Sequence, residues 1–408
     1  MRWKSSLNSL AASRYEWIIV AVGVLVMLAC LGVARFAFGI ILPAMAKGLA
    51  LDYEQQGWLG TGYFSGYMVM VALAPFLAAR TGNRAAITLG LSLIALSMAS
   101  LGFAGGYVPA LVLYSATGVG SSAANISMMA MIANWFGPAR RGTATGLVIM
   151  GNGLGIILSG FLVPLVVEMA GENGWRVAWL CLALVAALVA IMAGVFLRNA
   201  PKDQRERNQS EPTPSGKGHG RFITHLGLIY FLFGLTYIVY ATFFVTTLVD
   251  EQAFAHDVAG RFWAWVGFFS LFSGPLLGRV SDVMGRRSGL VAAYGVQTGA
   301  YLLAAYGVLV SNQPALYGSV VLFGLTAWSV PAIMAATIAD RLGPKRTAKG
   351  FSQITFFLAV GQVLGPVGAG KLANHVGGFA WCYAICAGLT LCAIALSLAL
   401  PGRDGQVS

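Results

Sequence analysis

The hydrophobic pattern of the chain is a series of long apolar stretches separated by short polar loops. Twelve stretches are long enough to cross the roughly 30 Å hydrocarbon core of a bilayer as helices. Only helices can cross in this way without leaving backbone polar groups unsatisfied. They cover residues 17–46, 57–79, 85–105, 108–135, 143–167, 177–198, 225–249, 258–278, 288–309, 314–339, 350–371 and 378–400. The pattern predicts an all-α membrane protein with twelve transmembrane helices.

Composition supports a lipid environment. The 408 residues are 58% hydrophobic and 10% charged, whereas soluble domains carry about 25% charged residues. A formal charge of +12 could indicate nucleic-acid binding. The basic residues, however, lie in short loops, and the chain carries no nucleic-acid-binding motif. We therefore expect the lipid bilayer, and no nucleic acid, as a partner.

The basic residues also predict the orientation. Of the 26 Lys and Arg residues, only Lys47, Arg176, Arg261 and Lys371 fall outside when both termini are placed in the cytoplasm. This distribution satisfies the positive-inside rule. The first apolar run is too long for a signal peptide and is expected to be retained as a span. We expect a multi-pass protein of the bacterial inner membrane with both termini cytoplasmic.

A polar break divides the chain into two six-helix halves. Residues 199–221 are rich in Pro, Gly, Ser and charge, which is typical of a flexible linker. The halves are then residues 1–198 and 222–408. A Gly-Pro loop with basic residues follows the fourth span, at 135–141, and recurs after the tenth, at 341–346. These similar loops predict two pseudo-symmetric halves related by a parallel repeat.

One loop carries a specific motif. Residues 278–287 read GRVSDVMGRR, which resembles the G-x-L-[AS]-D-x-x-G-R-[RK] signature of the major facilitator superfamily. The matching loop after the second span, residues 75–84, keeps the Gly and the basic ends but has Ala79 where the acid belongs. With the twelve spans, the linker and the repeated Gly-Pro loop, the resemblance covers nearly the whole chain. It implies the fold of that superfamily.

Three stretches resemble one branch of that superfamily. Residues 35–45, 134–142 and 174–176 are similar to the bacterial monocarboxylate-transporter-like and oxalate–formate antiporter branch. Two features depart from it. The first span lacks the acidic-Gly-Gly-aromatic motif of monocarboxylate carriers, and residues 262–277 of the eighth span carry no Arg where such carriers place a substrate-binding cation. The resemblance implies a small organic anion as substrate and leaves its identity open.

Arg35 is the residue around which the functional argument is built. It is the only Lys or Arg deep inside an apolar span, and no Asp or Glu falls inside any span. A guanidinium at membrane depth costs several kcal/mol unless it faces water or a partner. An anionic substrate is one partner. The alternative is that Arg35 bonds to backbone carbonyls of a broken helix or extends toward the membrane surface.

Other mid-depth polar residues complete the candidate site. The resemblance implies that the first, fourth, seventh and tenth spans line the cavity. Hydroxyl and amide groups are the neutral donors that hold a carboxylate beside a guanidinium. For each aromatic residue taken alone, packing is the alternative. The candidate substrate-binding residues are Arg35, Tyr67, Asn125, Tyr237, Tyr240, Trp328 and Gln362.

A second candidate set concerns closure of the cytoplasmic side. In the superfamily, the acid of the loop signature sits against the N-terminal end of a helix in the opposite half. The resemblance therefore implies a conformational latch in which Asp282, with Arg286 and Arg287, faces the start of the fifth span near Arg140 and Arg141. Ala79 supplies no matching contact to the eleventh span.

These observations predict a secondary transporter that moves a small organic anion, a monocarboxylate or dicarboxylate, by alternating access. Coupling could be proton symport or anion exchange, so protons or a counter-anion are further partners, and we expect a monomer. The alternative is a proton-coupled exporter of amphipathic compounds or drugs, which the lack of an embedded acid disfavours. The chain has no P-loop, H-E-x-x-H or Gly-x-Ser-x-Gly motif. We therefore expect no enzyme, no cofactor and no metal.

Overall fold

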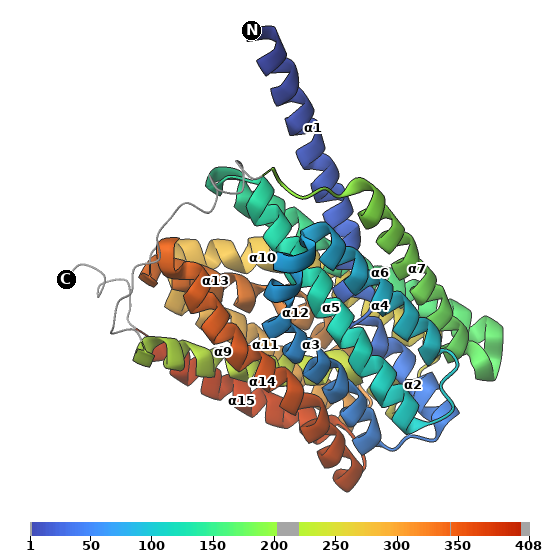
Figure 1. Cartoon of the computed structure of the whole chain (residues 1–408). Coiled ribbons are helices and arrows are strands. Elements are labelled where there is room, and N and C mark those ends of the chain that lie inside the picture. Colours follow the sequence, from blue (N-terminus) through green and yellow to red (C-terminus); the bar gives the residue numbers. More distant parts are fainter. Residues whose placement is uncertain (1, 202–219, 343, 401–408) are drawn as a thin grey trace.

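A computed structural model describes residues 2–201, 220–342 and 344–400, which form a bundle of long helices (Figure 1). The described residues contain no strand. Most of the predicted linker, residues 202–219, lies outside the described part of the chain. The prediction of an all-α fold is confirmed, and the helices of the described residues cover all twelve predicted spans.

The helices follow the predicted spans closely. In chain order they are α1 (Arg2–Met27), η1 (Leu28–Val33), α2 (Ala37–Leu49), α3 (Tyr53–Thr81), α4 (Asn83–Leu101), α5 (Tyr107–Trp135), α6 (Pro138–Ala170), η2 (Gly171–Asn173), α7 (Gly174–Phe196), α9 (Gly220–Thr246), η3 (Thr247–Glu251), α10 (His256–Met284), α11 (Arg286–Leu309), α12 (Gln313–Thr326), α13 (Ser329–Leu342), α14 (Pro344–Val376) and α15 (Ala380–Leu398). The first span consists of α1, η1 and α2, the seventh of α9 and η3, and the tenth of α12 and α13. Eight helical segments of the described residues are long and apolar enough to cross a membrane.

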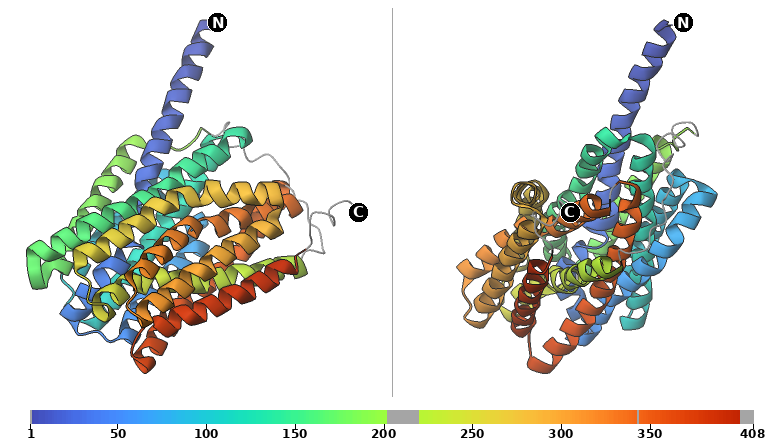
Figure 2. Two further views of the ribbon diagram at one scale, coloured as in Figure 1. Left: turned by 180° about the vertical axis from the view of Figure 1, so that it is seen from behind. Right: turned by 90° about the vertical axis from the view of Figure 1, so that its left-hand side faces the viewer.

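Within each half of the bundle, long helices pack along one another. In the N-terminal half, α5 lies against α3 and α4, and α4 lies against α7. In the C-terminal half, α9 packs along α14, and α11 packs along α12 and α15. Figures 1 and 2 show the red and orange helices of the C-terminal half gathered on one side of the bundle, with α14 beside α3 where the halves meet.

The two halves meet through two long helix pairs, α3 with α14 and α6 with α10. Glycines allow the close approach. A Cβ at Gly57 would overlap the carbonyl oxygen of Pro366, and a Cβ at Gly260 would overlap that of Gly160. Across the first pair, Thr61 donates a hydrogen bond of 2.7 Å to the carbonyl of Val363. The backbones of opposite halves therefore touch without intervening side chains.

These cross-half contacts lie on one side of the bundle. We call it the outer side, because it carries Lys47, Arg176, Arg261 and Lys371, the four residues that the loop charges predict to lie outside. Gly57 is near the start of α3, and Pro366 is in the second half of α14. Lys371 also forms an ion pair of 3.6 Å with Glu54 across the halves. The outer side is therefore closed in this structure.

The first span is broken where it carries Arg35. The segment η1 is a π-helix, and Ala34 to Phe36 form a turn before α2 begins. The backbone N–H groups of Arg35 and Phe36 both point to the carbonyl of Leu31, at 3.2 Å each. The hydroxyl of Tyr114 on α5 approaches the Ala34 and Arg35 carbonyls at 3.3 and 3.4 Å. Single π-helical turns inside helices are frequent at functional sites.

The tenth span is also broken, between α12 and α13. Pro331 lacks an N–H and cannot continue the hydrogen-bond ladder. The N–H of Ala327 bonds instead to the carbonyl of Gly324 in a tighter turn, at 3.2 Å. The prediction of one uninterrupted span over residues 314–339 missed this break, although the sequence has Pro331 inside that range.

Candidate functional site

Aromatic rings surround the Arg35 guanidinium. Its Cζ lies 5.1 Å from the ring centre of Phe36, 4.7 Å from that of Phe64 and 5.4 Å from that of Tyr237. These rings come from α3, α9 and the turn that carries Arg35 itself. Such contacts stabilise a cation by about 0.5–2 kcal/mol each, but they leave its N–H groups without acceptors.

The guanidinium has unsatisfied donors. Its Nε and Nη2 atoms are buried and have no hydrogen-bond partner among the described residues. The ion pairs of the described residues all involve other cations at helix ends. The expected alternative, in which Arg35 bonds to carbonyls of a broken helix, is therefore not what the described residues show. Two parallel N–H donors are the geometry that binds a carboxylate bidentately.

Two amide–phenol pairs flank Arg35, one in each half. Asn125 on α5 donates to the Tyr67 hydroxyl at 2.6 Å, and Gln362 on α14 donates to the Tyr237 hydroxyl at 2.6 Å. Since each phenol oxygen accepts from an amide, each hydroxyl hydrogen remains available for another acceptor. The site therefore has more donors than acceptors, which suits an anion.

Tyr63 and Ser121 extend the donor-rich region, although neither belonged to the predicted substrate-binding set. They lie next to each other on α3 and α5, and Tyr63 is also close enough to Arg35 to interact electrostatically. Both hydroxyls are buried without a hydrogen bond of normal geometry. The spacing of Tyr63 and Tyr67, one turn apart on one helix, is the sequence signal that places both on one face.

Trp328 joins the two broken spans. Its ring meets that of Phe36 edge-on, with ring centres 5.5 Å apart and planes at 79°. Phe36 in turn contacts the Arg35 guanidinium. Phe36, Tyr237 and Trp328 also line one small apolar void. The structure thus brings together six of the predicted residues: Arg35, Tyr67, Asn125, Tyr237, Trp328 and Gln362.

Tyr240 lies apart from this group. Its side chain is fully buried in the core of the C-terminal half, where the ring stacks on Phe244 and Phe323. Its hydroxyl pairs with Ser319 at 2.9 Å. Tyr240 follows Tyr237 by three residues, but its hydroxyl is already satisfied within its own half.

The predicted latch residues are paired within their own halves here. Arg140 binds Glu16 on α1 at 2.9 Å, and Asp282 binds Arg286. Arg286 also binds Asp340 at 2.7 Å. Arg141 donates to the carbonyls of Ala133 and Phe136, and Arg287 is exposed. No ion pair of the described residues joins the two groups in this conformation, and the latch stays a prediction.

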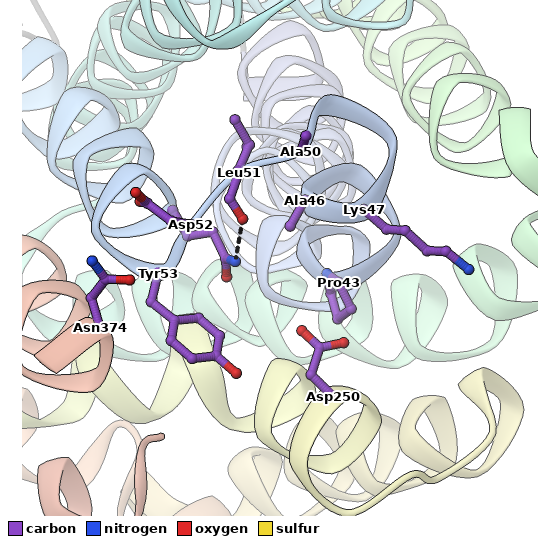
Figure 3. A pocket seen from close by; sticks show the side chains of 10 residues that line it. Pro43, Ala46, Lys47, Ala50, Leu51, Asp52, Tyr53, Asp250 and Asn374 are labelled. Atoms are coloured by element: carbon purple, nitrogen blue, oxygen red, sulfur yellow. Dashed lines mark hydrogen bonds between the residues drawn. The ribbon is translucent and has the colours of Figure 1, made fainter. Parts of the chain in front are cut away.

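A separate hollow of 450 Å³ opens on the outer side between the halves (Figure 3). Pro43, Lys47 and Tyr53 line it from the N-terminal half, and Asp250 and Asn374 from the C-terminal half. Figure 3 shows Asp250 facing Pro43 while Lys47 points away from it. Arg35 is not among its lining residues, so this hollow is distinct from the candidate site.

Comparison with known proteins shows to which family the chain belongs. A family model described as "Uncharacterised MFS-type transporter YbfB" matches residues 27–398. The chain belongs to this family of the major facilitator superfamily. The transporter is therefore a membrane protein and not an enzyme, and the resemblance inferred from its loop motifs is confirmed.

Individual relatives are more distant. The transporter is 23% identical over 378 residues to the "Probable sulfoacetate transporter SauU" of Cupriavidus necator, covering 85% of this chain and 84% of that one. It is 23% identical over 288 residues to the oxalate:formate antiporter of Oxalobacter formigenes, covering 67% and 65%. The crystal structure of a D-xylose–proton symporter superposes with a TM-score of 0.77 at 16% identity, covering 97% of this chain and all of that one. That likeness supports the fold.

Proposed function

We propose that the transporter moves a small organic anion, a monocarboxylate or dicarboxylate, across the bacterial inner membrane by alternating access. The observation that carries the proposal is the Arg35 guanidinium, whose Nε and Nη2 donors are buried and have no acceptor among the described residues. A substrate carboxylate supplies two acceptor oxygens and one negative charge. The sulfoacetate and oxalate:formate relatives support an organic anion as the substrate class.

The neutral donors around Arg35 support the same ligand. Tyr67 and Tyr237 each accept from an amide and keep a hydroxyl hydrogen for the substrate. These two hydroxyls come from opposite halves, so a bound anion would link both halves. A substrate that contacts both halves meets different partners when the halves move, so its affinity differs between two conformations and it can change their relative stability.

With the orientation that the loop charges predict, the closed outer side faces away from the cytoplasm. The described conformation is then inward-facing, with both termini cytoplasmic. In the opposite conformation Asp282 would approach the start of α6 near Arg140, as the latch prediction states. Coupling would be proton symport or anion exchange, because the described apolar spans contain no carboxylate that could carry the proton alone.

The test is transport into proteoliposomes with a panel of labelled mono- and dicarboxylates. We expect uptake of at least one carboxylate by the purified transporter and loss of that uptake in Arg35→Met. Arg261→Met is the matched control, because Arg261 is an exposed cation on the outer side that pairs with Asp257. Uptake that survives Arg35→Met would refute the proposal, and so would equal loss in both variants.

A further inference from the structure

The break in the tenth span leaves one backbone donor without its helical partner. In a regular helix the N–H of Trp328 would bond to the carbonyl of Gly324, four residues earlier. In this structure Ala327 bonds to that carbonyl instead, at 3.2 Å. A buried N–H without an acceptor is strongly unfavourable, so the break requires an acceptor from another element.

Ser273 on α10 supplies that acceptor. Its Oγ accepts from the Trp328 N–H at 3.1 Å and donates its own hydrogen to the carbonyl of Ser270 at 2.8 Å. The hydroxyl hydrogen is thus directed along α10, and the lone pairs of the oxygen are left for Trp328. Ser273 is fully buried, so water cannot replace this contact.

We propose that Ser273 is a positioning residue for the anion site, acting through Trp328. The Ser273–Trp328 bond fixes the backbone at the break, and the Trp328 ring then meets Phe36 edge-on. Phe36 in turn contacts the Arg35 guanidinium. Ser273 therefore connects α10 with the one cation that lies deep inside the described apolar spans, although its own side chain does not touch that cation.

This role gives the eighth span a contribution to the site in place of the missing cation. The span carries no Arg between residues 262 and 277. Instead, the eighth span holds the Trp328 backbone through Ser273, and the rings of Trp328 and Phe36 form the apolar surface next to Arg35. The effect of Ser273 on substrate affinity rests on the proposed function, whereas its effect on the position of Trp328 does not.

The first experiment reads out Trp328 without any substrate. The protein has ten tryptophans, so incorporation of 5-fluorotryptophan gives ten ¹⁹F resonances, and Trp328→Phe assigns one of them. We expect Ser273→Ala to shift or broaden the Trp328 resonance. Ser273→Cys, which keeps the size and has a weaker acceptor, should have a smaller effect and covers the case in which the alanine variant fails to fold.

Ser270→Ala is the matched control. Ser270 lies three residues earlier on the same helix, is also buried, and bonds to the carbonyl of Gly267 within its own helix. We expect it to leave the Trp328 resonance unchanged. An unchanged Trp328 resonance in both Ser273 variants, or an equal change in Ser270→Ala, would overturn the positioning role.

The second experiment tests the consequence for binding. Ser273→Ala should raise the dissociation constant of a transported carboxylate about three- to tenfold, as expected for loss of one buried hydrogen bond. In a Trp328→Ala background the same substitution should add less than about twofold, because the ring through which it acts is gone. Full additivity would overturn the connection through Trp328. A wild-type protein that binds no carboxylate would instead refute the proposed function and leave the ¹⁹F result standing.

Discussion

Replacing Arg35 by Met distinguishes a role of this residue in ligand binding from a role in stabilising the fold. If Arg35 binds the substrate, the variant loses two charge-assisted hydrogen bonds of about 1.5–3 kcal/mol each. The total of about 3–6 kcal/mol corresponds to a loss of affinity of about 100-fold to 10,000-fold, at 1.4 kcal/mol for each factor of ten. Calorimetric titration with a transported carboxylate measures this loss directly.

The same substitution should not destabilise the fold. A buried cation without a counter-charge has a desolvation cost of several kcal/mol, and its three ring contacts recover about 0.5–2 kcal/mol each. Methionine keeps much of the side-chain volume, removes that cost and packs well against rings. We therefore expect the unfolding temperature of Arg35→Met to be equal to that of the wild type or higher.

Arg176→Met provides the contrast. The Nη1 atom of Arg176 donates to the carbonyls of Gly102 and Ala104 at 3.1 and 2.9 Å, and its Cζ lies 4.2 Å from the Trp175 ring centre. Its removal leaves two carbonyls without a donor, so this variant should melt at a lower temperature while still binding substrate. The reasoning about Arg35 would be refuted if Arg35→Met melted as early as Arg176→Met and bound the carboxylate normally.

Three further predictions concern selectivity and conformation. A carboxylate should bind better than its amide by more than about 1 kcal/mol, the value of a neutral hydrogen bond, and equal affinities in calorimetry would contradict an anion site. Gly57→Ala should hinder outer closure, because its Cβ would overlap the carbonyl oxygen of Pro366. Engineered cysteines on the outer side should then become more accessible to labelling. Gly274→Ala is the control, because its Cβ would meet nothing within 4 Å, and it should leave the labelling unchanged. Asp282→Asn should shift the population toward the inward-facing state by about tenfold if the latch contributes about 1.4 kcal/mol, and Ala79→Asp should shift it the other way. Unchanged cysteine labelling in both variants would exclude the latch.

The helical segments were predictable because a helix that crosses the hydrocarbon core of a membrane must be both long and apolar. The interruptions were harder to predict. Residues 17–46 read as one uniform run, and only the unsatisfied charge of Arg35 distinguishes its middle. In the tenth span, Pro331 is compatible with a break. The sequence does not show, however, that the N–H of Ala327 takes the Gly324 carbonyl and leaves the N–H of Trp328 without it; only the folded backbone shows this.

Pairings between spans were not predictable from the sequence. Buried amides such as Asn125 and Gln362 need hydrogen-bond partners, but helix rotation decides that these partners are Tyr67 and Tyr237. Tyr240 shows the same limit, since three residues along a helix move a side chain by about 300° around the axis. Composition and periodicity identify which groups are buried, and tertiary packing decides which groups meet.

With alternating access, the lone guanidinium would also make the transporter sensitive to voltage. In alternating access, the membrane potential falls mainly across whichever side is closed. With the predicted orientation, outer closure would put Arg35 near the cytoplasmic potential, and inner closure would put it near the external one. Moving one elementary charge through 100 mV is worth about 2.3 kcal/mol. A negative interior would therefore hold the empty carrier inward-facing, a bound monoanion would cancel that bias, and a dianion would reverse it.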